Sequence, residues 1–188
     1  MADLPALFRR NADNFGALVD GVGDGAWSDS TPCSEWDVRA LVNHVVGEQL
    51  WAPHLVAGET IADVGDRYDG DVLGVDPKAA WHGSIGGAVA AFDGADLDAI
   101  THLSFADLPC SEYLKQMITD LAVHGWDLAK ATGGDTTIDP ETATLLLEMW
   151  TALEDMVRGS GVFGAKVEVP AGADDQTKLL ALLGRDPK

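Results

Sequence analysis

The spacing of apolar positions along the chain predicts a protein built mostly of helices. From about Leu4 to Val22, apolar residues recur every three or four positions, which is the period of one helix face. Further helical segments are expected at residues 34–57, 76–92, 111–132, 139–158 and 175–183. Since no pair of strands is evident, the sequence predicts an all-α fold whose helices pack as a bundle, within a single domain spanning residues 1–188.

Start signals set the boundaries of several of these segments. Asp-Pro pairs at 76–77 and 139–140 combine a capping carboxylate with a proline at the first helical position. The Pro-Cys-Ser-Glu phrases at 32–35 and 109–112 are interpreted as two more helix starts. Three segments between helices show no helical period and are expected to be a long loop, a connection and a strand-like stretch: residues 59–75, 94–108 and 166–170.

Two polar residues interrupt the apolar face of the segment at 111–132. Asp120 and His124 are one helical turn apart, on the same stripe as Leu121 and Leu128. Burying a carboxylate and an imidazole without partners is unfavourable, so a metal ion, a mutual hydrogen bond or a substrate is needed to offset that cost. A hydrogen-bonded Asp–His pair explains the spacing as well as a metal site does.

The segment at 34–57 supplies a third candidate ligand. His44 falls on a stripe with Leu41, so its imidazole is expected to point inward. Two histidines and one carboxylate from facing helices make a site that leaves at least one coordination position for water or substrate. The sequence therefore offers His44, Asp120 and His124 as ligands of one divalent ion, with a hydrogen-bonded core histidine as the alternative for His44.

Other residues close to these positions have candidate roles. Glu48, one turn beyond His44, is a candidate general base, fourth ligand or ligand-orienting group, and the alternative is a solvated helix glutamate. Trp51 is the first candidate for the wall of a ligand pocket. Asp127 is expected to face away from the site and to pair with Lys130. The remaining histidines lack a partner at ligand spacing and are expected at the surface or in loops: His54, His82 and His102.

Composition narrows the classes of function. Of the 188 residues, 31 are acidic and 12 are basic, which gives a formal net charge of −19. This charge repels phosphate backbones and anionic lipids, so neither nucleic acid nor a membrane is an expected partner. The chain lacks a run of about 20 apolar residues and a signal-peptide pattern at its start, so a cytoplasmic location is expected. Cys33 and Cys110 form neither a ligand pair nor a disulfide framework.

Several phrases of the chain resemble a known family. The resemblance is carried by TPCSEWDVRALVNHVVGE, DLAVHGWDLAKATG and the tail VEVP…LLALLGRDP. They are similar to the actinobacterial metal-binding branch of the DinB/YfiT-like superfamily, and to the amino-terminal domain of mycothiol-dependent maleylpyruvate isomerase. The resemblance covers nearly the whole chain. It implies a four-helix bundle in up-down-down-up order, with an extra helix and a short carboxy-terminal extension.

The resemblance also implies a cofactor and an activity. The family's metal ligands match His44, Asp120 and His124, with Asp120 where the isomerase has Glu, and the usual metal is zinc. There the metal activates the sulfur of a low-molecular-weight thiol such as mycothiol, which attacks an electrophilic substrate, so a thiol S-transferase is expected. Two alternatives stay open: a non-catalytic metal-binding bundle that forms a homodimer, and a metal-dependent hydrolase with Glu48 as base. The same ligands suit nickel, iron or manganese.

Overall fold

The computed structural model describes residues 2–160 and 163–187, which form two compact units. The first unit runs from Asp3 to Thr136, and the second begins at Thr137. The expectation of one domain over residues 1–188 stays a prediction. Among the described residues, none of the helices combines the length and the apolar character that a membrane span needs.

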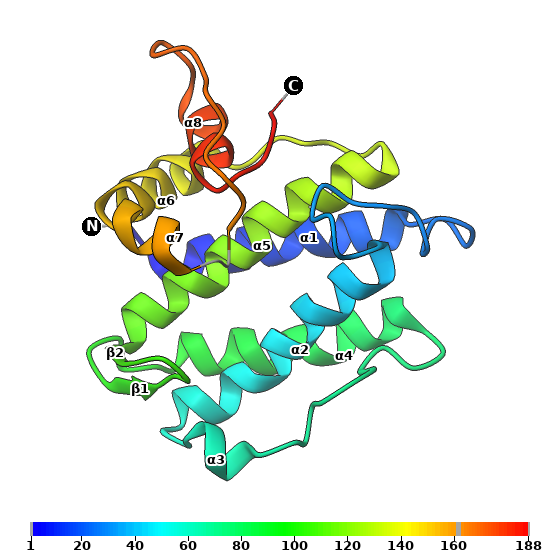
Figure 1. Ribbon diagram of the computed structural model, residues 1–188. Helices are drawn as coiled ribbons and strands as arrows, with labels where there is room; N and C mark the ends of the chain where they lie inside the picture. Colours follow the sequence, from blue (N-terminus) through cyan, green and yellow to red (C-terminus); the bar gives the residue numbers. More distant parts are fainter. Residues whose placement is uncertain (1, 161–162, 188) are drawn as a thin grey trace. The chain divides into compact units, whose positions relative to one another are not determined.

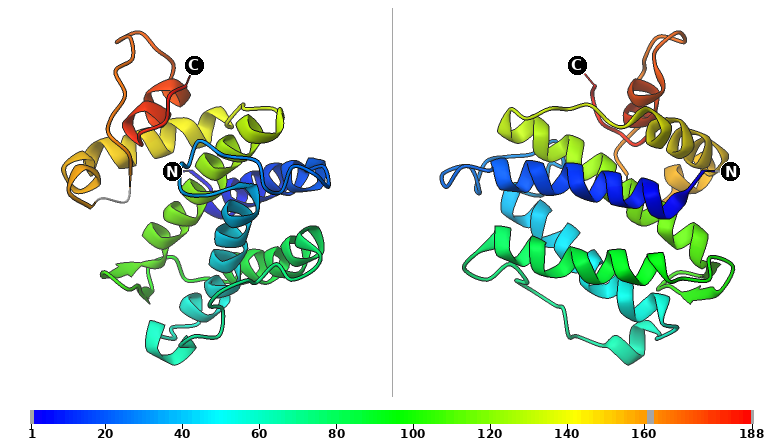
Figure 2. Two further views of the ribbon diagram at one scale, coloured as in Figure 1. Left: turned by 45° about the vertical axis from the view of Figure 1, so that its right-hand side comes forward. Right: turned by 180° about the vertical axis from the view of Figure 1, so that it is seen from behind.

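Four long helices form the body of the first unit (Figure 1). They are α1 (Leu4–Gly21), α2 (Val38–Val56), α4 (Pro77–Asp93) and α5 (Cys110–Thr132). Both α1 and α2 pack against α4 and against α5, and the two turned views of Figure 2 follow the same arrangement from other sides. The helical bundle that the sequence predicts is therefore confirmed.

Local side-chain chemistry fixes the ends of these helices. The carboxylates of Asp3 and Asp76 accept hydrogen bonds from backbone N–H groups in the first turns of α1 and α4. Both helices also have a proline in the first turn, where no N–H partner is required. Gly133 ends α5 with φ at 73°, a left-handed conformation that glycine adopts without strain.

The start of α2 corrects one expectation. The helix begins at Val38, not near Ser34, because the Asp37 carboxylate caps it by accepting from the N–H of Ala40 at 2.8 Å. The preceding residues are held in a turn, in which the Thr31 hydroxyl is 2.8 Å from the carbonyl of Trp36. Of the two Pro-Cys-Ser-Glu phrases, only the second therefore begins a helix.

The segment at 59–75 is not wholly irregular. It contains the one-turn helix α3 (Ile61–Val64). A capping box between Thr60 and Asp63 satisfies backbone N–H groups at the start of this helix. Since four residues are too few to show a helical period, the sequence pattern could not reveal this helix.

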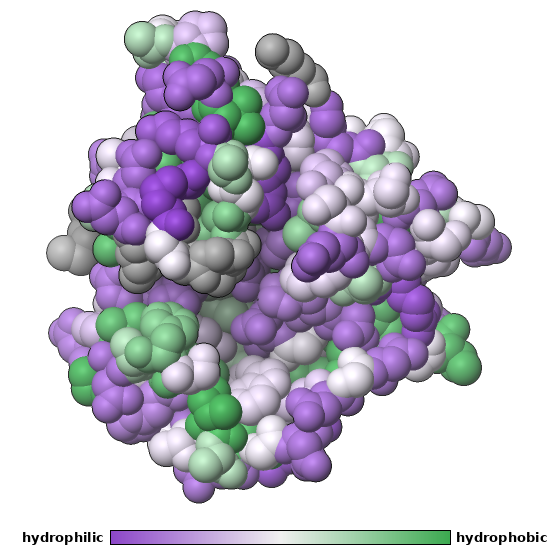
Figure 3. All heavy atoms as spheres, viewed as in Figure 1, coloured by the Kyte–Doolittle hydropathy of each residue, from purple (hydrophilic) through white to green (hydrophobic). Residues whose placement is uncertain are grey.

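The connection at 94–108 contains most of a hairpin, a pair of strands that the sequence pattern did not indicate. Strands β1 (Ile100–His102) and β2 (Asp107–Pro109) pair antiparallel with Thr101 opposite Leu108. Ile100 and Phe105 are exposed here, and Figure 3 shows a hydrophobic area over this hairpin.

The second unit carries the remaining helices, α6 (Pro140–Ala152), α7 (Glu154–Ser160) and α8 (Asp175–Leu182). The single helix expected at 139–158 is divided at Leu153. The strand-like stretch at 166–170 is irregular. The Val167 N–H donates to the carbonyl of Ala181, and among the described residues this stretch pairs with no strand.

The core of the first unit lies between its four long helices. Two aromatic pairs join α1 to α4, with ring centroids 5.0 Å apart for Phe8 and Phe92 and 4.9 Å apart for Phe15 and Trp81. The α2 side chains Leu41 and Val45 are fully buried. Because this apolar face of α2 packs into the core, its more polar face is turned away from it.

Candidate metal centre

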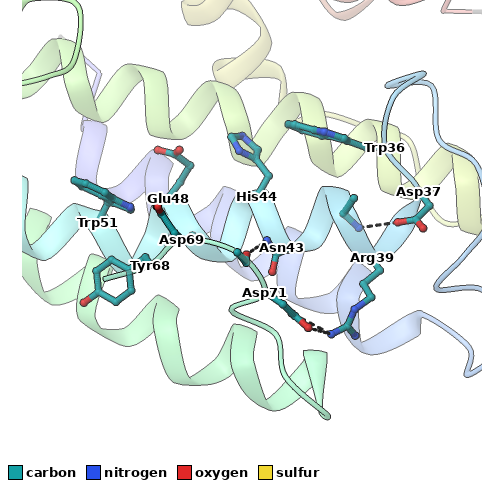
Figure 4. Close-up of a pocket in the computed structure, with 13 residues that line it drawn as sticks. Trp36, Asp37, Arg39, Asn43, His44, Glu48, Trp51, Tyr68, Asp69 and Asp71 are labelled. Carbon is teal, nitrogen blue, oxygen red and sulfur yellow. Dashed lines mark hydrogen bonds and ion pairs between the residues drawn. The ribbon is translucent and has the colours of Figure 1, made fainter. Parts of the chain in front are cut away.

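One face of α2 lines a groove of about 690 Å³. The face is formed by residues spaced three or four apart, which helix geometry brings to one side: Ala40, Asn43, His44, Gly47, Glu48 and Trp51. Residues 68–71 form the opposite wall, and Trp36 lies at the end nearest the start of α2 (Figure 4). Trp51 is thus part of the lining, and its contact with a ligand stays a prediction.

Asp120 and His124 occupy successive turns of α5 and project toward α2. The Asp120 side chain is 31% exposed and that of His124 is 11% exposed, so the pair is not sealed from solvent. The structure brings both residues to His44, whose Nε2 is 3.9 Å from Oδ2 of Asp120. One ligand atom each from His44, Asp120 and His124 lies within 4.8 Å of the others.

Aromatic contacts hold the two imidazoles in place. The His44 and His124 rings meet edge to face, with centroids 5.2 Å apart. The Trp36 ring contacts both of them, at 4.7 Å from His44 and 5.5 Å from His124. Because these rings restrict one another, the ligand atoms are oriented before any ion binds.

The donor set fits a divalent metal ion. Two imidazole nitrogens and a carboxylate oxygen are preferred zinc ligands, and two ligands about 2.1 Å from a tetrahedral ion lie roughly 3.4 Å apart. The 3.9 Å between His44 and Asp120 is too long for a hydrogen bond and only slightly wider than that spacing. In the part of the chain that the structure describes, Glu48 does not join this cluster, so three ligands would leave a coordination position open.

A buried hydroxyl close to Glu48 and Asp120 lacks an acceptor in the part of the chain that the structure describes. Tyr113 Oη has no hydrogen-bond partner among the described residues. Burial, followed by the charges of Glu48 and Asp120, raises the pKa of Tyr113 well above its ordinary value, so the hydroxyl remains a donor. An unsatisfied buried donor costs about 1–3 kcal/mol, and a ligand at the neighbouring centre would offset that cost.

Two of the ionisable residues that line the groove, His44 and Glu48, have pKa values that burial shifts strongly. Burial, and then the nearby His124, lowers the pKa of His44 from 6.5 to about 4, so its imidazole is neutral at pH 7 and has a lone pair to offer. Burial, and then the charge of Asp120, raises the pKa of Glu48 from 4.5 to about 7.

Asp127 corrects a further expectation. It does not face away from the site: its side chain is fully buried and its Oδ2 is 3.1 Å from Nδ1 of His124. Lys130 lies over the Trp126 ring, 5.4 Å from its centroid. A carboxylate on one imidazole nitrogen fixes the ring and leaves Nε2 as the nitrogen for an ion. The spacing of three residues between His124 and Asp127 was the signal in the sequence that could have indicated this contact.

Cys33 also lies beside His124. Its sulfur is within 4.8 Å of a ligand atom of His124 and of Asp127. The residue belongs to the turn that precedes α2, so its proximity to α5 depends on the tertiary fold and could not be read from sequence spacing.

The other three histidines lie outside the candidate centre, but they do have partners. Each has a ring nitrogen 2.9–3.0 Å from a carboxylate oxygen, in the pairs His54 with Glu59, His82 with Asp20, and His102 with Asp107. None of these carboxylates stands at ligand spacing from its histidine, since two lie five residues away in sequence and the third comes from another helix.

Replacing Glu48 with glutamine is expected to change how the stability of the metal-free protein depends on pH. In the wild type the unfolded chain loses the Glu48 proton near pH 4.5 and the folded chain near pH 7, so folding becomes less favourable as the pH rises through that window. Glu48→Gln lacks this loss. Its free energy of unfolding, relative to the wild type, should rise by about 2–3 kcal/mol from about pH 4 to pH 8.

Urea unfolding of chelator-treated protein measures this difference. Asp120, His44, His124 and Tyr113 surround position 48 in both proteins, so the difference reports the Glu48 carboxyl together with its coupling to these neighbours. The exposed Glu35→Gln is the matched control. A difference between Glu48→Gln and wild type that does not vary with pH would contradict the expected ionisation of Glu48.

The chain is similar to known proteins both in sequence and in fold. The family described as the mycothiol maleylpyruvate isomerase N-terminal domain matches residues 8–129. Two proteins from strains of Mycobacterium tuberculosis, both described as uncharacterized, are each 33% identical to this chain over 183 residues, with 94% of both chains covered.

A solved structure is similar in fold. The crystal structure of the mycothiol-dependent maleylpyruvate isomerase superposes with a TM-score of 0.62 at 14% identity, covering 81% of this chain and 71% of that chain. At this identity the likeness shows the fold alone, and it supports the DinB-like arrangement of helices that the resemblance implied.

Proposed function

Because the chain belongs to the mycothiol maleylpyruvate isomerase N-terminal domain family, a DinB/YfiT-like group, we propose that it is a metal-dependent thiol S-transferase. It would join a low-molecular-weight thiol, such as mycothiol, to an electrophilic small molecule. The observation that carries the proposal is the cluster of His44, Asp120 and His124 beside an open groove. Three ligands and an accessible fourth position are typical of catalytic rather than structural zinc sites.

The residues of the centre have distinct roles in this proposal. His44, Asp120 and His124 would hold a divalent ion, with zinc as the first candidate. When bound, that ion would lower the pKa of a thiol and so favour the nucleophilic thiolate at neutral pH. Asp127 would keep the His124 ring oriented through its contact with Nδ1.

Glu48 and the groove would serve the reacting molecules. Glu48 lines the groove one turn from His44, where it can accept the proton that the thiol releases. Trp36 and Trp51 would bound the electrophile at the two ends of the lining. In the transfer, an S–C bond forms, the bond from carbon to its leaving group breaks, and the thiol proton passes to Glu48. The net charge of −19 supports small molecules, rather than nucleic acid or membranes, as partners.

Zinc-loaded protein is expected to accelerate thioether formation between mycothiol and an aryl halide. The halide released is measured against protein treated with a chelator, and the rate should fall at least tenfold without metal. Glu48→Gln should lower the rate by about 100-fold while keeping the metal, because a general base contributes about that much.

The same samples separate the alternatives. Metal-dependent cleavage of an activated ester with no thiol present would favour a hydrolase that uses Glu48 as base. A protein that gains thermal stability from zinc but turns over neither substrate would favour a non-catalytic metal-binding bundle.

A further inference from the structure

The groove beside the metal centre is long and has an open floor. Its lining extends along α2 from Asp37 to Trp51, which at about 1.5 Å per residue is roughly 20 Å. Gly47 lies between His44 and Trp51, and a Cβ built on it would meet no atom within 4 Å. A glycine inside a helix weakens that helix relative to alanine, and no packing contact explains it here. The missing side chain at Gly47 thus leaves space in the groove for a bound molecule.

Aromatic rings stand at one end of this groove. Trp51 and Tyr68 meet edge to face with centroids 6.3 Å apart (Figure 4). The Tyr68 hydroxyl lies 2.9 Å from Nε2 of His54, a residue that is not part of the lining. The face of such a ring attracts a cation, and carries no preference for an anion.

The charges of the lining are strongly unbalanced. The lining contains the carboxylates of Asp37, Glu48, Asp69 and Asp71, whereas Arg39 is its only arginine or lysine. Arg39 is already engaged, since its Nη2 is 2.8 Å from Oδ2 of Asp71 and 2.7 Å from the carbonyl of Gly74. An entering carboxylate would therefore meet an excess of like charge, and the Arg39 guanidinium is already paired with one of the carboxylates of the lining.

We infer that this groove binds a small organic cation with an aromatic or apolar body, and that it selects against carboxylates. The ammonium group lies between the Asp69 carboxylate and the Trp51 ring, and the apolar body lies over Gly47. This inference rests on the proposed function only in assigning that cation as the electrophilic substrate. The binding preference itself requires no metal.

Three probes with one benzyl ring and different charge test the preference on metal-free, full-length protein. They are benzyltrimethylammonium, benzyl alcohol and phenylacetate. The binding of each is measured by tryptophan fluorescence and by calorimetry. We expect the cation to bind at least threefold tighter than the alcohol, and at least tenfold tighter than the anion. The advantage of the cation should shrink in high salt. Equal affinities, or tighter binding of phenylacetate, would overturn the inference.

Two pairs of variants locate the binding site. Gly47→Leu fills the floor and should weaken benzyltrimethylammonium at least tenfold, whereas Gly83→Leu, on an exposed turn of α4 with equally open surroundings, should not. Asp69→Lys should abolish the preference for the cation, whereas Asp13→Lys, exposed on α1, should change it less than twofold. Unaltered binding in both Gly47→Leu and Asp69→Lys would place the cation elsewhere and overturn the inference.

These experiments distinguish a failure to fold from a loss of cation binding, and a loss of cation binding from a loss of thiol transfer. Trp51→Leu offers a second route to weaker binding if Gly47→Leu does not fold. If the binding order fails while zinc-dependent thiol transfer is present, only the substrate class is wrong. If the binding order holds while transfer is absent, the proposed function is wrong and the cation site stands.

Discussion

Alanine at His124 or at His44 is expected to remove nearly all divalent metal from the purified protein. Each substitution deletes one of three ligands, and His124→Ala also removes the imidazole that Asp127 contacts at 3.1 Å. We expect the affinity for zinc to fall more than 100-fold, since disturbing even the groups that orient a ligand costs 10- to 100-fold. Asp120→Asn keeps the shape but loses the charge, so its loss should be smaller.

Elemental analysis after zinc loading and dialysis gives the metal content, and circular dichroism shows whether each variant is folded. His82→Ala is the matched control, because His82 is an exposed helix histidine that pairs with Asp20 outside the centre. It should retain a full equivalent of metal. The three-residue site would be refuted by full metal content in both His44→Ala and His124→Ala.

Asp127→Ala should weaken zinc binding by about 10- to 100-fold, although Asp127 is not expected to touch the ion. Without its carboxylate the His124 ring loses the contact at Nδ1 that orients it and favours Nε2 as the ligand atom. Asp127→Asn can still accept a hydrogen bond from Nδ1 but carries no charge, so its effect should be intermediate.

Competition with a chromogenic chelator measures these affinities. Lys130→Ala is an informative control, because the sequence alone suggested that Lys130 was the partner of Asp127. Since Lys130 lies over Trp126, its removal should leave zinc affinity within about twofold of wild type. A large loss in Lys130→Ala, together with no loss in Asp127→Ala, would contradict the orienting role of Asp127.

The sequence was most informative where helix chemistry is local. The Asp-Pro pairs predicted the starts of α4 and α6, and the one-turn spacing of Asp120 and His124 predicted that they share a face. His44 was brought to them by a second stripe on α2. These features depend on residues within one or two turns, so a single chain displays them without any knowledge of the fold.

Features that depend on tertiary contacts were not predictable in this way. The position of Asp127 relative to the His124 stripe allowed either a buried or an outward carboxylate, and only the packing of α5 decides between them. Each strand of the hairpin is three residues long, too short to establish an alternating pattern. The outer wall of the groove comes from residues 68–71, whose sequence has no period at all.

The candidate centre and the wall opposite it are built from different kinds of structure. The ligand residues stand on α2 and α5, whereas residues 68–71 belong to an irregular segment tied to α2 by Asn43, which bonds the Gly70 carbonyl and the Val72 N–H at 2.9 Å each. Exchange of this short segment between relatives would therefore alter which molecule is recognised without moving the groups that hold the ion. Under the proposed function, such an arrangement would let new substrate ranges evolve through a few loop substitutions while the reaction chemistry is inherited unchanged.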